Sequence, residues 1–124
     1  VFDTVLQWLI EDTPGHVINF SRGFPWSKTS TMRQSSPLYS IHNARTPTLI
    51  HVGARDERVP AAHSRGLYRA LKDYLRVPAE LVIYPGEGHG LRKRSHRHAK
   101  MLWDIAWFDH YVLKKTRKRS KHTD

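Results

Sequence analysis

Two short apolar runs, each closed by glycine, constrain the fold of this chain more than any other feature of its sequence. The first covers 47–53 (Pro-Thr-Leu-Ile-His-Val-Gly); the second covers 79–84 (Ala-Glu-Leu-Val-Ile-Tyr) and is followed by Pro-Gly. Runs of this length, rich in β-branched residues, are typical of strands buried on both faces of a parallel sheet. Between them, apolar residues at helical spacing predict a helix over 61–75: Leu67, Leu71, Tyr74 and Leu75. We therefore expect two parallel strands joined by a right-handed helical crossover.

Further helices are expected on both sides of this unit. Apolar residues at helical spacing predict one helix over 1–10 and another over 96–113, whereas 16–39 is typical of loops with one or two short helices. Two strands alone would leave an unpaired edge on a very small sheet. We therefore expect more strands to precede this chain, which begins without an initiating Met. The fold class is α/β, with parallel strands, flanking helices and an incomplete sheet.

An aspartate and a histidine follow the two predicted strands at their carboxyl ends. Asp56 comes three residues after the first strand, and His89 comes five residues after the second. Reacting groups gather at the carboxyl ends of strands in open parallel sheets. A hydrogen bond between these two side chains is therefore geometrically easy, and it would orient the imidazole and stabilise its protonated form. The glycines around His89 would allow positive φ and bring the ring up to the site.

Each of these residues also has a simpler interpretation. An aspartate just before a helix commonly caps the helix or forms a turn, and a single histidine in a loop is commonly just exposed. Their order along the chain favours the catalytic interpretation, because nucleophile, acid and base follow each other in this order in α/β-hydrolases.

Four motifs in the right order and spacing resemble the end of the catalytic domain of the prolyl oligopeptidase family. This family includes dipeptidyl and acylaminoacyl peptidases, and the resemblance covers 1–113. The motifs are Ser-Pro-Leu-Tyr at 36–39, Thr-Pro-Thr-Leu-Ile-His-Val-Gly at 46–53, Asp-Glu-Arg-Val-Pro at 56–60 and Tyr-Pro-Gly-Glu-Gly-His-Gly at 84–90. The resemblance implies an α/β-hydrolase fold and a serine peptidase that uses a Ser-Asp-His triad and no cofactor.

The resemblance also implies roles for individual residues. Asp56 matches the triad acid of the family, and His89 matches its general base. Arg58 is similar to an arginine that holds a substrate backbone carbonyl in some members. An arginine at this position could instead pair with Glu57 or Glu87.

The nucleophile of the family has no counterpart in the sequence. It belongs to a Gly-x-Ser-x-Gly turn between a strand and a helix, and no serine here has glycine at both −2 and +2. Ser64 comes nearest but falls inside the helix predicted after the first strand, and Ser21 follows no apolar strand. We assign neither, and we expect the nucleophile upstream of this chain and the chain alone to be inactive.

Composition limits the other classes of function. The 124 residues contain no cysteine and no apolar run near the roughly 20 residues that span a bilayer. Disulfides, thiolate metal sites and a cysteine nucleophile are thereby excluded, and a cytoplasmic protein without membrane partner is expected.

The histidines of His96-Arg97-His98 point apart on a helix, so no metal site is expected. Trp103, Trp107 and Tyr111 form a second stripe on the last predicted helix, suited to packing or to a partner surface.

The formal net charge of +10 is unevenly distributed, because six of the 21 Lys and Arg residues lie in 114–124. We expect 1–113 to be the catalytic-domain part and 114–124 a disordered basic tail without nucleic-acid affinity. The expected partners are a peptide substrate and the N-terminal part of the same protein. Two alternatives remain: an esterase or dienelactone-type hydrolase, and a non-catalytic interaction module whose basic tail binds polyanions.

Overall fold

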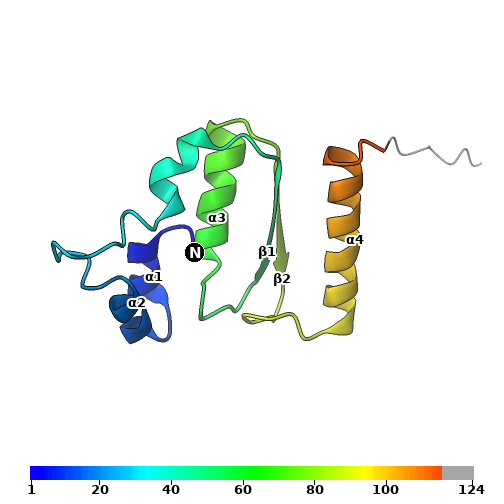
Figure 1. The fold of residues 1–124 in the computed structure, drawn as a ribbon. Helices are drawn as coiled ribbons and strands as arrows, with labels where there is room; N and C mark the ends of the chain where they lie inside the picture. Colours follow the sequence, from blue (N-terminus) through cyan, green and yellow to red (C-terminus); the bar gives the residue numbers. More distant parts are fainter. Residues whose placement is uncertain (116–124) are drawn as a thin grey trace, which may run out of the picture.

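The computed structural model describes residues 1–115, and the tail expected at 114–124 lies outside them except for its first two residues. Two strands and several short helices precede one long helix (Figure 1). The elements in chain order are α1 (Thr4–Ile10), α2 (Pro14–Phe20), the 3₁₀ helix η1 (Pro37–Asn43), β1 (Thr48–Gly53), α3 (Ala62–Arg69), its π-helical continuation η2 (Ala70–Tyr74), β2 (Ala79–Tyr84) and α4 (Arg94–Tyr111).

The strands β1 and β2 pair in parallel, which confirms the expected strand–helix–strand unit. Their register runs from Thr48 opposite Ala79 to Gly53 opposite Tyr84, so both strands end at the same level. Figure 1 shows α3 on one face of this pair and α4 on the other. The small core between α3, η2 and the start of β2 is formed by Leu71, Val77 and Ala79.

The N-terminal helices α1 and α2 pack against each other and differ in detail from expectation. The Asp3 carboxylate accepts a hydrogen bond from the Val5 backbone N–H at 3.0 Å and caps α1. Pro14 begins α2, because proline is well tolerated in the first helical turn. The segment 16–39, expected to be loops with one or two short helices, contains most of α2 and the first residues of η1.

The long helix α4 shows an unexpected face to the sheet. Its apolar stripe lies on one face, as predicted, yet that face is about half exposed, from 49% at Met101 to 63% at Val112. Its less exposed side instead carries polar and aromatic residues: His96, Lys100, Asp104, Trp107 and Tyr111. Two of these polar side chains have partners outside the helix: Asp104 contacts His51 on β1, and His96 contacts Glu87 on the loop after β2. Lys100 pairs with Asp104 within α4.

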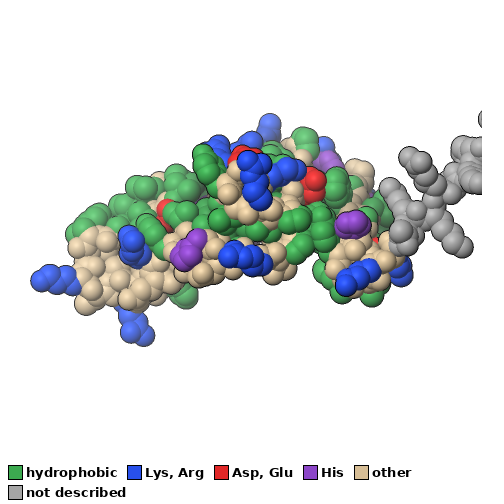
Figure 2. All heavy atoms as spheres, turned by 90° about the horizontal axis from the view of Figure 1, so that it is seen from above, with side chains coloured by type: hydrophobic (Ala, Val, Ile, Leu, Met, Phe, Trp, Pro, Cys, Tyr) green, Lys and Arg blue, Asp and Glu red, His purple; other side chains and the backbone are tan. Residues whose placement is uncertain are grey.

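The aromatic stripe of α4 divides between packing and exposure. Trp107 and Tyr111 contact each other with ring centroids 4.5 Å apart and line a small cavity at the start of β2. Trp103 is 42% exposed. Figure 2 shows apolar side chains exposed over much of the face seen from above. Within 1–115, no helix combines the length and the hydropathy needed to cross a membrane.

Candidate active site

The loops after β1 and β2 are held against each other by backbone contacts. The Ala54 N–H donates to the Tyr84 carbonyl and the Arg55 N–H to the Glu87 carbonyl, both at 2.9 Å. Gly53 makes this approach possible, because an added Cβ there would lie 2.1 Å from the Gly88 carbonyl oxygen. The two loops therefore leave the sheet side by side, as expected for neighbouring parallel strands.

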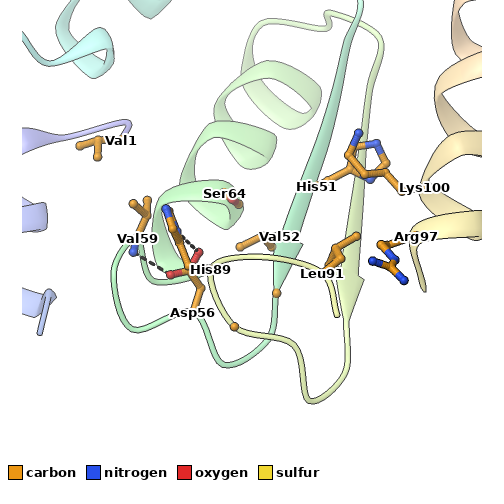
Figure 3. A pocket seen from close by; sticks show the side chains of 12 residues that line it. Val1, His51, Val52, Asp56, Val59, Ser64, His89, Leu91, Arg97 and Lys100 are labelled. Atoms are coloured by element: carbon orange, nitrogen blue, oxygen red, sulfur yellow. Dashed lines mark hydrogen bonds and ion pairs between the residues drawn. The ribbon is translucent and has the colours of Figure 1, made fainter. Parts of the chain in front are cut away.

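Asp56 and His89 meet at this edge of the sheet (Figure 3). His89 Nδ1 lies 3.0 Å from Asp56 Oδ2, while Asp56 Oδ1 accepts hydrogen bonds from the backbone N–H groups of Arg58 at 3.0 Å and Val59 at 2.8 Å. The carboxylate is nearly buried, with 8% of its side chain exposed, whereas 63% of the imidazole is exposed. The backbone thus fixes the orientation of the carboxylate, and the carboxylate fixes one nitrogen of an otherwise accessible ring.

This contact determines which nitrogen of His89 can act as a base. An ionised carboxylate only accepts hydrogen bonds, so Nδ1 of the neutral imidazole must carry the proton. Nε2 then has a free lone pair, and no described residue is hydrogen-bonded to it. The arrangement can accept a proton at Nε2 and share the resulting positive charge with Asp56.

Only part of the expectation for the glycines around His89 is correct. Gly86 has φ of +73°, in the region that favours glycine, and turns the chain after β2. Gly88 and Gly90 do not have positive φ. Gly88 instead provides the carbonyl that packs closely on Gly53. The ring of His89 is therefore brought to the site by one left-handed turn and one close backbone approach.

Arg58 lies next to this pair but is not bonded to the residues we expected. Its Nε lies 3.3 Å from Asp12 Oδ1, so pairing with Glu57 or Glu87 is wrong. Asp12 reaches Arg58 because the Asp12 N–H donates to the Glu57 carbonyl and holds the α1–α2 connection there. Arg58, 61% exposed in its side chain, lines a cavity of about 630 Å³ together with His89.

A second cavity of about 610 Å³ contains Asp56, His89 and Ser64 (Figure 3). Ser64 belongs to the first turn of α3, as the sequence indicates. In the part of the chain that the structure describes, no serine hydroxyl is hydrogen-bonded to His89. Among the same residues, no three His, Asp or Glu side chains are grouped as metal ligands would be.

Two polar clusters near the site were missed in the sequence. His63 is buried between α1 and α3, where Nδ1 accepts from the Phe2 N–H at 3.2 Å and Nε2 contacts Gln7 Oε1 at 2.8 Å. Burial lowers the pKa of His63, so the ring is neutral with its proton on Nε2. Neither partner is near His63 in the sequence, so local spacing holds no signal for this cluster.

The second cluster joins β1, β2 and the loop of His89 to α4. It consists of His51, Tyr84, Glu87, His96, Lys100 and Asp104. Its only sequence signal is the spacing of four between the polar residues of α4, which places them on one helix face.

The comparisons with known proteins agree on one family. The profile of the prolyl oligopeptidase family matches residues 1–115. The acylamino-acid-releasing enzyme of Homo sapiens is 36% identical in an alignment of 93 residues, which covers 68% of this chain and 13% of that enzyme. The enzyme of the same name from Arabidopsis thaliana is 27% identical over 105 residues, or 85% of this chain and 14% of that enzyme. The chain thus spans about one seventh of the length of these relatives.

Solved structures agree as to the fold. The acylaminoacyl peptidase of Pyrococcus horikoshii superposes on all of this chain with a TM-score of 0.75 at 21% identity, and 20% of that protein is covered. An acylaminoacyl peptidase in complex with Z-Gly-Gly-Phe-chloromethyl ketone superposes on 97% of this chain and 20% of its own, with a TM-score of 0.80 at 21% identity. The expected α/β-hydrolase fold class is thereby confirmed. With a matched family profile over nearly its whole length, the chain belongs to the prolyl oligopeptidase family.

Proposed function

We propose that this chain provides the acid and the base of a Ser-Asp-His triad in a serine-type peptidase that hydrolyses peptide bonds of oligopeptides. The observation that carries the proposal is the 3.0 Å contact between Asp56 Oδ2 and His89 Nδ1 at the carboxyl ends of two parallel strands. The serine nucleophile and the oxyanion hole come from outside these 124 residues, and the chain alone is inactive.

In this mechanism His89 first accepts a proton as a general base and then donates it as a general acid. Its Nε2 takes the proton from the serine hydroxyl as the hydroxyl oxygen attacks the scissile carbonyl carbon. The imidazolium then donates this proton to the nitrogen of the leaving amine as the carbon–nitrogen bond breaks. Water repeats the sequence on the acyl-enzyme and restores the serine. Asp56 accepts the Nδ1 hydrogen bond throughout and stabilises the positive charge on the ring.

We also propose that Arg58 binds the substrate. Its Nε is held by Asp12, while its terminal nitrogens have no hydrogen-bond partner among the described residues. They are free to donate to a backbone carbonyl of a peptide in the cavity shared with His89. Guanidinium groups are well suited to such planar, paired donation.

We propose further that no cofactor takes part in the reaction and that the protein acts in the cytoplasm.

Substitutions in the full-length protein test the triad. Asp56→Asn and His89→Ala should each lower turnover of aminoacyl arylamides by about 10³- to 10⁶-fold, because triad members act as a unit. Asp73→Asn and His98→Ala are matched controls, since both residues are exposed and lie outside the site. Unchanged turnover in either site variant would remove both residues from the mechanism. Short acyl esters assayed in parallel separate a peptidase from an esterase, which would prefer the esters.

A further inference from the structure

The loop that carries His89 is closed by a buried carboxylate. Glu87, only 4% exposed, lies two residues before His89. Its Oε2 accepts hydrogen bonds from the Arg92 N–H at 2.7 Å and the Lys93 N–H at 3.3 Å, and His96 Nδ1 lies 3.4 Å away. One side chain therefore joins the start of the loop to its end and to the first turn of α4.

The contacts of Glu87 also begin the helix α4. Lys93 is the N-cap residue, and within the described chain its side chain forms no capping hydrogen bond. The carboxylate of Glu87 accepts from the backbone N–H of this N-cap residue and of Arg92 before it, and it places negative charge near the positive end of the helix dipole. Burial alone would raise the pKa of Glu87, but the N–H groups of Arg92 and Lys93 and the His96 imidazole outweigh it, so its pKa is lowered. The group therefore stays a carboxylate at neutral pH.

The helix α4 is in turn fixed to the strands by a second set of polar contacts. Asp104 Oδ1 lies 2.9 Å from His51 Nε2, and His51 Nδ1 lies 2.9 Å from the Tyr84 hydroxyl. Lys100 Nζ donates to the other oxygen of Asp104 at 2.6 Å. Because the carboxylate only accepts, His51 donates from Nε2 and accepts from Tyr84 at Nδ1. Burial raises the pKa of Tyr84, so the phenol keeps its proton as a donor.

We propose that Glu87 is a positioning residue for His89, with α4 as the rigid support to which it ties the loop. This inference rests on the proposed role of His89 as general base. The ring of His89 is largely exposed, and Asp56 is its one hydrogen-bonding partner among the described residues. Its position relative to a nucleophile therefore depends on how firmly the loop backbone is held. A displacement of about 1 Å at such a site costs about 10²-fold in rate.

The test compares three substitutions of Glu87 in the full-length protein. Glu87→Ala removes the acceptor and should lower kcat by about 10- to 100-fold with little change in KM, because loop position and not substrate contact is lost. Glu87→Gln keeps an oxygen for the Arg92 and Lys93 N–H groups and should recover most of this loss. Glu80→Ala is the matched control, since Glu80 pairs with Lys72 at the surface, away from the loop of His89, and this variant should have wild-type kcat.

A spectroscopic measurement separates positioning from a general loss of structure. The downfield NMR signal of the His89 Nδ1 proton should weaken or shift in Glu87→Ala and return in Glu87→Gln. If Glu87→Ala does not fold, Glu87→Asp takes its place, because the shorter side chain cannot span the same contacts. Wild-type kcat and an unchanged His89 signal in the folded variant would overturn the proposal. His89→Ala is assayed in the same series. Wild-type turnover in His89→Ala would refute the proposed function. If His89→Ala loses turnover and Glu87→Ala does not, only the role of Glu87 is refuted.

Discussion

The closest backbone approach in the site gives the sharpest prediction, for Gly53→Ala. The added Cβ would lie 2.1 Å from the Gly88 carbonyl oxygen and 2.4 Å from the Glu87 carbonyl oxygen. Both oxygens belong to the backbone, so the clash cannot be relieved by a change of side-chain rotamer. Ordinary contact begins at 3.4 Å, and the two loops must therefore separate by roughly 1.3 Å.

This separation acts directly on the proposed acid–base pair. Gly53 ends β1 three residues before Asp56, and Gly88 directly precedes His89 on the loop after β2. The shift would therefore stretch the 3.0 Å contact between the two side chains beyond hydrogen-bond length. We expect kcat to fall by about 10²-fold, the cost of a displacement of about 1 Å at a catalytic group. The free energy of unfolding should fall by about 1–3 kcal/mol, as for other overpacked positions.

The assay is the hydrolysis of an aminoacyl arylamide by the full-length protein, together with urea unfolding of the same samples. Gly90→Ala is the matched control from the same loop, because no described atom lies within 4 Å of a Cβ added there and its φ is not positive. Gly90→Ala should keep wild-type stability and kcat. Wild-type kcat in Gly53→Ala would refute the claim that the two loops must touch for the pair to act.

Three further predictions concern stability. Burial lowers the pKa of His63, so the folded state resists protonation of this ring. The free energy of unfolding should therefore fall as the pH drops below about 6.5. A His63→Gln variant with the same pH dependence of stability would contradict this. Leu71→Ala should reduce the free energy of unfolding by about 2–5 kcal/mol, since Leu71 is 2% exposed in the small core. A loss below about 1 kcal/mol in urea unfolding would mean that this core is not well packed. Gly86→Ala should cost about 1–2 kcal/mol in the same assay because of its φ of +73°, and an unchanged midpoint would show that the turn relaxes.

The parts of the fold that follow from local pattern could be predicted from the sequence. The two strands, the helix between them and the loop positions of Asp56 and His89 all depend on residues close in the chain. The parallel register then brings the two side chains together without further information. Each strand end also has a glycine or proline–glycine boundary that fixes where its loop begins.

Contacts between distant residues could not be predicted in this way. Arg58 pairs with Asp12, which the backbone of the α1–α2 connection brings near it in space. In the sequence, Glu57 is a much nearer carboxylate, so local spacing favoured the wrong partner. The face of α4 that meets the sheet depends on His51 and Glu87, both far from their partners on the helix. Periodicity identifies an apolar stripe but not which side of the helix faces the strands, since here polar partners on β1 and on the loop after β2 determine it.

The central claim is that Asp56 and His89 act as one catalytic unit, and a double-mutant cycle on kcat/KM of the full-length protein tests it most directly. Asp56→Asn alone should lower kcat/KM by about 10⁴-fold, and adding it to His89→Ala should cost nothing beyond the loss from His89→Ala itself. Losses that multiply in the double variant would mean that the carboxylate and the imidazole act independently, and would contradict the account.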